Sequence, residues 1–346
     1  MNLSEKKRIA LLTFGNDLFQ SEVMIKCLTA EAARFGFDLL VVNGGRYQVS
    51  QGMEYMHNTL YSYLHEGLID GLIINKIFEY DDFEERAAHL PNWESLPKVS
   101  LANPMKNIPS VLIDNRTGFS DLMDHLILEQ GCEKFGLVVP RLETSLRDFT
   151  ERESIFYEKL RENNIEIDDE CVFRGRYDYE GGKKVVVDQI LKDRHDIQAL
   201  VCLNDELALG AIREIQKRGK QVPYDIKVTG FDNSAESSFI YPSLTTVTYP
   251  FTQIAERGME LMYSLINNKP VPKETYVPTY FIPRLSSGYS LTETVHSKYY
   301  RFDIENSRTE GYTIEAALES FRSGNLSDVA AFHLKNSNLY MSDEQL

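Results

Sequence analysis

Short apolar runs alternate along the chain with segments whose apolar positions recur at helical spacing. Helical spacing is clearest from Val23 through Leu28 to Phe35, and it stops at Gly36. Strands that alternate with helices predict right-handed βαβ units and parallel sheets covered on both faces. The runs predicted to be strands are 9–14, 37–42, 71–74, 99–102, 111–113, 135–139 and 199–203. The predicted helices include 55–65, 120–129, 152–163, 181–191 and 252–266.

The segment from Leu203 to Asn233 carries polar residues where two predicted strands end. Asn204 and Asp205 follow the run 199–203, and Asp232 and Asn233 follow the next run. In open α/β sheets, ligands bind outside the carboxyl ends of the strands. We therefore expect these four residues to face a small molecule. Asn204 and Asp205 could instead cap the helix that follows, and we favour the cap for Asp205.

Charge and hydropathy narrow the class of protein. A net charge of −15 over 346 residues argues against a general nucleic-acid-binding surface, which would be basic. No apolar run reaches the roughly 18 residues of a membrane-spanning helix. The first residues lack the pattern of a secretory signal, so we expect a cytoplasmic chain without membrane association. The cysteines, with no C-x-x-C spacing, are expected to be buried free thiols: Cys27, Cys132, Cys171 and Cys202.

Sequence signatures of catalysis are absent from the chain. It contains no Gly-x-Ser-x-Gly, His-Glu-x-x-His or phosphate-binding Gly-x-x-x-x-Gly-Lys segment. Paired carboxylates such as Glu84–Glu85 and Asp168–Asp169 are better explained as solvated charges. We expect a binding protein rather than an enzyme, with no cofactor and no metal.

Several segments, in matching order, resemble one family. They are VLIDNRTG at 111–118, LILEQGCEKFGLV at 126–138, the segment 203–233, and PSLTTVTYPF at 242–251. Together they resemble the effector-binding core of the lactose-repressor/galactose-repressor regulators, from about Arg8 to about Tyr289. The resemblance implies an α/β, periplasmic-binding-protein type I fold: two Rossmann-like lobes with parallel sheets and three interlobe crossovers.

The same resemblance implies the domain organisation. An N-terminal lobe would combine 6–115 with 250–278, and a C-terminal lobe would combine 116–249 with 279–290. Crossovers near 115, 249 and 279 would act as a hinge that closes around ligand. Residues 291–346 lie outside the resemblance and form a tail of unknown role, with one plausible amphipathic helix at 314–321.

Five candidate ligand contacts follow from the resemblance: Arg152, Asn204, Asp232, Tyr177 and Phe251. An arginine fork can hold vicinal hydroxyls or a carboxylate, an amide both donates and accepts, and a carboxylate accepts from two hydroxyls. The aromatic faces would pack against a sugar ring. Strand-end loops of the first lobe add Asn16, Asp17, Phe19, Tyr47 and Asn75.

Each of these contacts has an ordinary alternative. Arg152 could be a solvated surface charge, Phe251 could be core, and Tyr179 lies close enough to Tyr177 to compete for its place. The chain has Arg152-Glu-Ser-Ile155-Phe156 where the family has Arg-x-x-Gly before an aromatic residue. It also has Gly131-Cys132 where the family has Gly-His. A nucleoside, amino-acid-like or cationic ligand therefore stays open beside a sugar.

We expect the sensing domain of a transcriptional or signalling regulator that binds a sugar or related polyol and forms a homodimer. The chain starts at the first strand of the core, without the family's helix-turn-helix, so we expect no direct DNA binding. Two alternatives are a solute-binding protein of a transport system and the ligand-binding fragment of a diguanylate cyclase or histidine kinase. Residues 282–289 resemble the end of such fused sensor lobes.

Overall fold

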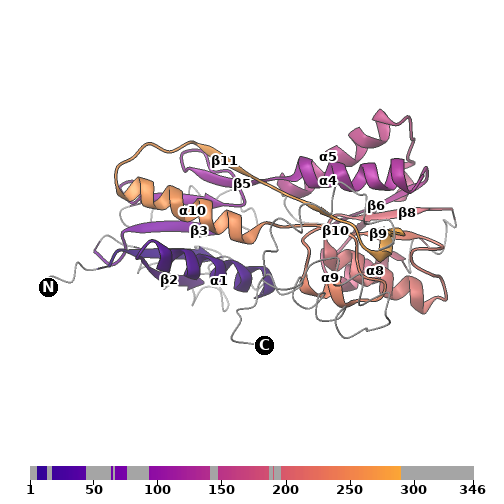
Figure 1. Cartoon of the computed structure of the whole chain (residues 1–346), viewed down its shortest axis with the longest axis horizontal. Helices are drawn as coiled ribbons and strands as arrows, with labels where there is room; N and C mark the ends of the chain where they lie inside the picture. Colours follow the sequence, from indigo (N-terminus) through magenta and orange to yellow (C-terminus); the bar gives the residue numbers. More distant parts are fainter. Residues whose placement is uncertain are drawn as a thin grey trace, which may run out of the picture. The chain divides into compact units, whose positions relative to one another are not determined.

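The computed structural model describes residues 6–13, 18–43, 64, 67–75, 93–140, 147–186, 190 and 196–289. They form two compact units (Figure 1). The first combines Met1–Asn115, Glu143–Thr150 and Pro250–Thr279, and the second combines Arg116–Leu142, Glu151–Tyr249 and Tyr280–Leu346. The expected tail helix lies outside the described residues, as does the helix expected at 55–65 apart from Leu64.

The first unit is built on a six-stranded sheet in which every pairing is parallel. The strand order is β11-β5-β4-β3-β1-β2. The strands are β1 (Arg8–Thr13), β2 (Asp38–Asn43), β3 (Gly71–Asn75), β4 (Lys98–Leu101), β5 (Ser110–Asp114) and β11 (Glu274–Pro278). The last strand joins the sheet beside β5 although it is far away in sequence.

Two helices distant in sequence cover this sheet together. α1 (Leu18–Arg34) packs against α10 (Phe251–Ile266), and Figure 1 shows them side by side. α10 also contacts β3, β4 and β5. Successive strand residues face opposite sides of a sheet. The sheet face opposite α1 and α10 is buried in an apolar cluster. This cluster includes Ala10, Leu12, Leu72, Ile74, Trp93, Leu96, Met105 and Ile108.

The second unit contains a four-stranded parallel sheet of order β7-β6-β8-β9. Its strands are β6 (Phe135–Pro140), β7 (Val172–Gly175), β8 (Ala199–Cys202) and β9 (Lys227–Thr229). β10 (Thr246–Val247) and β12 (Phe281–Ile282) form a small antiparallel pair. Its described helices are α4 (Asn115–Asp124), α5 (Arg147–Glu162), α6 (Tyr179–Val185), α8 (Asp205–Lys217) and α9 (Ala235–Phe239). The first residue of α4 and the first turn of α5 belong to the first unit. α4 continues as a π-helical turn, His125–Glu129.

Two glycines let α6 and α8 approach closely. A Cβ on Gly182 would lie 2.1 Å from the carbonyl oxygen of Leu207, and a Cβ on Gly210 would lie 2.0 Å from that of Tyr179. Any side chain at either position would therefore overlap main-chain atoms of the facing helix. The two helices bury a shared apolar face with Val185, Leu207 and other residues of the unit's core.

The fold class predicted from the alternating pattern is confirmed, because the main sheet of each unit is parallel throughout. The helices expected at 120–129 and 152–163 begin earlier, at Asn115 and Arg147. Their first turns are mostly polar, so apolar periodicity does not detect them. Cys132, Cys171 and Cys202 are buried free thiols as expected, whereas Cys27 is only partly buried. Within the described residues, no helix is long and apolar enough to cross a membrane.

Candidate functional site

The second unit brings three of the predicted ligand contacts onto neighbouring elements. Asn204 follows β8 and Asp232 lies just beyond β9, and these two strands pair in parallel. Both residues are therefore at the carboxyl edge of the sheet, where open α/β sheets bind ligands. Arg152, on α5, reaches the same edge because it contacts the residue that ends the β8 run.

Arg152 is buried, with 2% of its surface exposed, so its interpretation as a solvated surface charge is wrong. Its Nη1 donates a hydrogen bond to the carbonyl oxygen of Leu203 at 2.8 Å. Its guanidinium carbon lies 3.3 Å from the centre of the Phe231 ring. A buried charge needs partners, and a stacked guanidinium can still donate hydrogen bonds in its own plane. Glu153, the neighbouring acid, is paired with Arg174 at 2.9 Å.

Asn204 caps α8. Its Oδ1 accepts a hydrogen bond from the Leu207 amide at 2.9 Å, and its Nδ2 donates to the Tyr177 carbonyl oxygen at 2.8 Å. The expectation that Asp205 is the cap is wrong, because Asp205 is already the first residue of the helix. Each half of the Asn204 amide has further hydrogen-bonding capacity, so the cap and a ligand contact are compatible.

Asp205 is instead a buried carboxylate, 1% exposed. Its Oδ1 accepts from the Thr246 hydroxyl at 2.6 Å, and its Oδ2 accepts from the Ser234 amide at 2.7 Å. Burial raises the pKa of Asp205 to about 6, against the lowering effects of these two donors and of the Arg284 charge. Desolvation outweighs the donors here because the ionised form loses its water entirely.

This raised pKa predicts a specific pH dependence. The folded protein holds the Asp205 proton more tightly than the unfolded chain, in which the ordinary value is 3.8. The stability from this group is thus complete below about pH 4 and is lost as pH rises through about 6. We expect the Asp205 carboxyl resonance in a carbon-13 NMR titration to move near pH 6. Asp205→Asn should remove that part of the pH dependence of unfolding. A midpoint below pH 5 would contradict the prediction.

Asp232 and Asn233 both adopt positive φ angles, 121° and 52°. Consecutive non-glycine residues in this region are uncommon and are strained, and such strain clusters at functional sites. The main chain of Asp232 is held on both sides. Its amide donates to the Val247 carbonyl at 2.8 Å, and its carbonyl accepts from the Tyr249 amide at 3.2 Å. The Asp232 side chain remains partly exposed.

In the first unit, Asn75 is the candidate with the clearest structural signal. It ends β3 and is 1% exposed, and neither its Oδ1 nor its Nδ2 has a hydrogen-bond partner among the described residues. A buried amide without partners costs about 1–3 kcal/mol. Among the described residues, this strand end therefore has unused donor and acceptor capacity.

The other candidates divide into buried, half-buried and undescribed positions. Phe251 begins α10 and is 5% exposed, which fits its alternative interpretation as core. Tyr177 is half-buried, and the contact with Asn204 uses its main chain. Tyr179 begins α6 and packs against the core of the second unit. Phe19 lies in α1, but its side chain is outside the described residues, as are Asn16, Asp17 and Tyr47.

Sequence reasoning missed the residues that surround these candidates, chiefly Phe231, Ser234, Thr246 and Arg284. Phe231 stacks on Arg152, and Arg284 donates to the side chain of Asn233 at 2.6 Å. Arg284 lies in the short segment Pro-Arg-Leu-Ser-Ser-Gly, which has no periodicity to mark it. The resemblance stated for residues 282–289 covers Arg284 but does not mark it as a residue of the site.

Residues 123–287 match the family model of a periplasmic binding protein-like domain. This range contains Arg152, Asn204 and Asp232. Among curated proteins, the chain is similar to the HTH-type transcriptional regulator GalR of Escherichia coli K12, with 30% identity over 220 residues. That alignment covers 60% of this chain and 62% of GalR, so the chain spans less than two thirds of that relative.

Solved structures share the fold. The transcription regulator CcpA of Lactococcus lactis superimposes with a TM-score of 0.68 at 21% identity, over 82% of this chain and 99% of CcpA. A LacI family transcriptional regulator, CCPA from Weissella paramesenteroides, was crystallised with bound glucose. It superimposes with a TM-score of 0.65 at 19% identity, over 81% and 98% of the two chains. The fold is therefore the periplasmic-binding-protein-like type I fold, and the similar proteins are transcriptional regulators, not enzymes.

Proposed function

We propose that this chain is the ligand-sensing core of a transcriptional or signalling regulator, and that it binds a sugar-like polyol. The proposed contacts in the second unit are Arg152, Asn204 and Asp232. The observation that carries the proposal is the buried guanidinium of Arg152, which stacks on Phe231 at the strand-end edge. A guanidinium placed there can donate in-plane hydrogen bonds to ligand hydroxyls as well as to acceptors of the protein.

The chemistry of the three contacts suits vicinal hydroxyls. Arg152 offers several N–H donors in one plane, Asp232 accepts two hydroxyl hydrogen bonds, and Asn204 can donate or accept. An analogue that lacks one hydroxyl would leave a buried polar group unpaired, so such a site discriminates among polyols. The Weissella regulator with bound glucose supports the same ligand class at the level of the fold.

Within the first unit, Asn75 remains a candidate polar contact, because its buried amide has no hydrogen-bond partner among the described residues. The aromatic candidates are Tyr177 in the second unit and, separately, Phe251 in the first unit. The similar proteins are transcriptional regulators, and this supports a sensing rather than a transport role. Action as a cytoplasmic homodimer is part of the same proposal.

A thermal-shift screen of the full chain tests the ligand class. The panel contains D-galactose, D-glucose, maltose, cellobiose, adenosine and L-arginine. Ligand at about 100 times its Kd adds about 2.7 kcal/mol to the free energy of unfolding. We expect a sugar to raise the Tm, and we expect Asp232→Asn to abolish the shift.

The matched control is Asp196→Asn, because Asp196 is an exposed carboxylate of the second unit paired with Lys134. This variant should keep the shift. A shift with adenosine or arginine alone would replace the polyol by another ligand class. No shift with any compound would reject the sugar proposal, and a shift that survives in Asp232→Asn would remove Asp232 from the site.

A further inference from the structure

Residues 232–234, which follow β9, are held by side chains from three other segments; we call them the 232–234 loop. Asp205 accepts from the Ser234 amide at 2.7 Å, and the Thr246 hydroxyl accepts from the Asn233 amide at 3.3 Å. Nη2 of Arg284 donates to Oδ1 of Asn233 at 2.6 Å. In each contact, a side chain from outside the loop holds one of its residues.

The loop needs such contacts because of its backbone conformation. Asp232 and Asn233 have φ angles of 121° and 52°. A strained non-glycine conformation costs about 1–3 kcal/mol per residue and persists only where the surroundings over-determine it. Without external contacts the loop would relax, and the Asp232 carboxylate would then point elsewhere.

Arg284 links the loop to two further segments through one planar group. Its Nη1 donates to the Ser237 hydroxyl at 2.9 Å and to the Leu244 carbonyl oxygen at 2.8 Å. Together with Asn233, these acceptors surround the guanidinium. A lysine ammonium has donors at a single point and could not span the same set.

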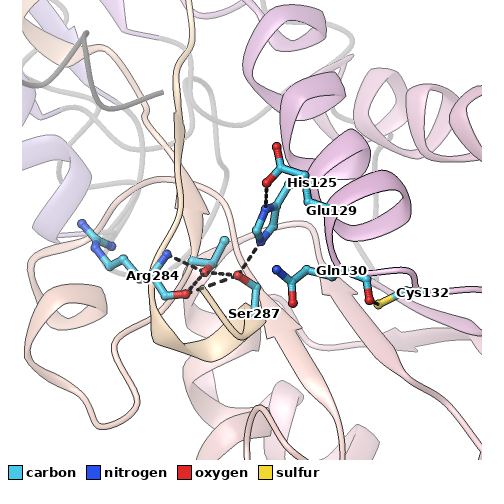
Figure 2. A network of polar contacts seen from close by, with 7 residues as sticks. His125, Glu129, Gln130, Cys132, Arg284 and Ser287 are labelled. Atoms are coloured by element: carbon cyan, nitrogen blue, oxygen red, sulfur yellow. Dashed lines mark hydrogen bonds and ion pairs between the residues drawn. The ribbon is translucent and has the colours of Figure 1, made fainter. Parts of the chain in front are cut away.

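The main chain of Arg284 is itself anchored. Its amide donates to the Thr245 hydroxyl, which in turn donates to the Arg284 carbonyl oxygen, both at 2.8 Å. The Thr245 hydroxyl also contacts the Ser287 hydroxyl at 2.8 Å. Figure 2 shows that the network continues through the His125 imidazole. Its Nε2 lies 2.9 Å from the Ser287 hydroxyl, and its Nδ1 lies 2.7 Å from a Glu129 carboxylate oxygen. Hydrogen bonds therefore connect the main chain of Arg284 to the π-helical turn after α4.

Asp205, which precedes the 232–234 loop in the sequence, also holds it. Its position requires Gly230, because a Cβ there would lie 2.2 Å from Oδ1 of Asp205. The Asp205 amide also donates to the Phe231 carbonyl at 2.7 Å, so this residue contacts the chain on both sides of the strained pair.

We propose that Arg284 and Asp205 are positioning residues, which hold the 232–234 loop and so direct Asp232 toward the ligand. Neither needs to touch the ligand. The proposal rests on the proposed function only where it says that Asp232 binds. The claim that these two side chains hold the loop is independent of any ligand, and it can be tested without one.

The test is amide hydrogen exchange, measured on the full chain without ligand. The variants are Arg284→Gln, Asn233→Gly and the double variant. Glycine tolerates positive φ, so Asn233→Gly removes the acceptor without adding backbone strain and leaves the other contacts of Arg284 in place. We expect the Asn233 and Ser234 amides to exchange at least tenfold faster in each single variant, and no faster in the double variant. Amides of β8 should keep their protection.

The matched control is Arg116→Gln, which removes another hydrogen-bonded arginine, paired with Glu158 at 2.8 Å and 2.9 Å. It should leave loop exchange unchanged. Unchanged loop exchange in Asn233→Gly would overturn the proposal, as would additive effects in the double variant. If Arg284→Gln does not fold, the Asn233→Gly result decides.

A second readout connects the loop to binding, with D-glucose as the probe. We expect Asn233→Gly to raise its Kd at least tenfold while the Tm of the free protein changes little. If glucose does not bind the unaltered chain, the sugar proposal is weakened, and the exchange data still decide whether the loop is held. If glucose binds equally well to both proteins, the positioning role is overturned and the proposed function stands.

Discussion

Gly210→Ala is expected to lower the free energy of unfolding by more than about 4 kcal/mol, an exceptional effect for one methyl group. The new Cβ would lie 2.0 Å from the carbonyl oxygen of Tyr179 and 3.0 Å from the amide nitrogen of Lys183. Both contacts are main-chain atoms of α6, so no side chain can rotate away and the helices must separate. Urea unfolding monitored by circular dichroism measures the change.

Arg213→Ala is the matched control for this substitution. Arg213 lies on the exposed side of α8, one turn from Gly210. Its replacement should change the free energy of unfolding by no more than about 0.5 kcal/mol. Stability close to that of the unaltered protein in Gly210→Ala would show that α6 and α8 do not approach as closely as the structure describes.

Arg152→Ala is expected to weaken binding of the sugar identified in the thermal-shift screen at least tenfold, and also to destabilise the protein. Sequence alone predicts lost binding with an almost unchanged melting temperature. The burial of Arg152 changes that expectation, because its loss leaves the Leu203 carbonyl without this donor and uncovers the Phe231 ring. An unsatisfied buried acceptor costs about 1–3 kcal/mol. Calorimetric titration and urea unfolding measure the two effects separately.

Arg152→Lys separates charge from shape at the same position. The ammonium can keep one hydrogen bond to Leu203 but cannot stack as a plane or donate in pairs. We expect stability to recover in part and binding to remain weak. Full affinity in either variant would place the ligand away from Arg152.

The fold could be predicted because both sheets are signalled by local sequence. Runs such as 71–74 and 135–139 are apolar throughout, which is typical of parallel strands buried on both faces. Helix starts were less predictable. The start of α5 was predicted at Arg152, but the helix begins at Arg147. The prediction was late because the first turn is mostly polar and shows no apolar periodicity. The pairing of β11 with β5 is not visible in local sequence, since only the family resemblance related such distant segments.

Residues of the candidate site were predictable only where a polar side chain directly follows a predicted strand. Asn204 and Asp232 were found in this way, and the cap at Asn204 was one of the alternatives. The exchange of roles between Asn204 and Asp205 could not be predicted, since either side chain can cap a helix. Tertiary contacts determine which residue is the cap, because the buried Asp205 carboxylate accepts hydrogen bonds from Thr246 and Ser234, which are distant in sequence. Arg284 was missed for the same reason.

The discontinuous make-up of the two units has a consequence for synthesis on the ribosome. The first unit starts with β1 (Arg8–Thr13), yet it needs α10 and β11, which end at Ile266 and Pro278. The second unit needs Ser286, whose hydroxyl donates to the Val228 carbonyl and accepts from the Thr245 amide. Neither unit can therefore complete its core until nearly the same late stretch has left the exit tunnel. The nascent chain carries two unfinished apolar surfaces until then, and chaperones that bind exposed apolar segments have a long interval in which to act.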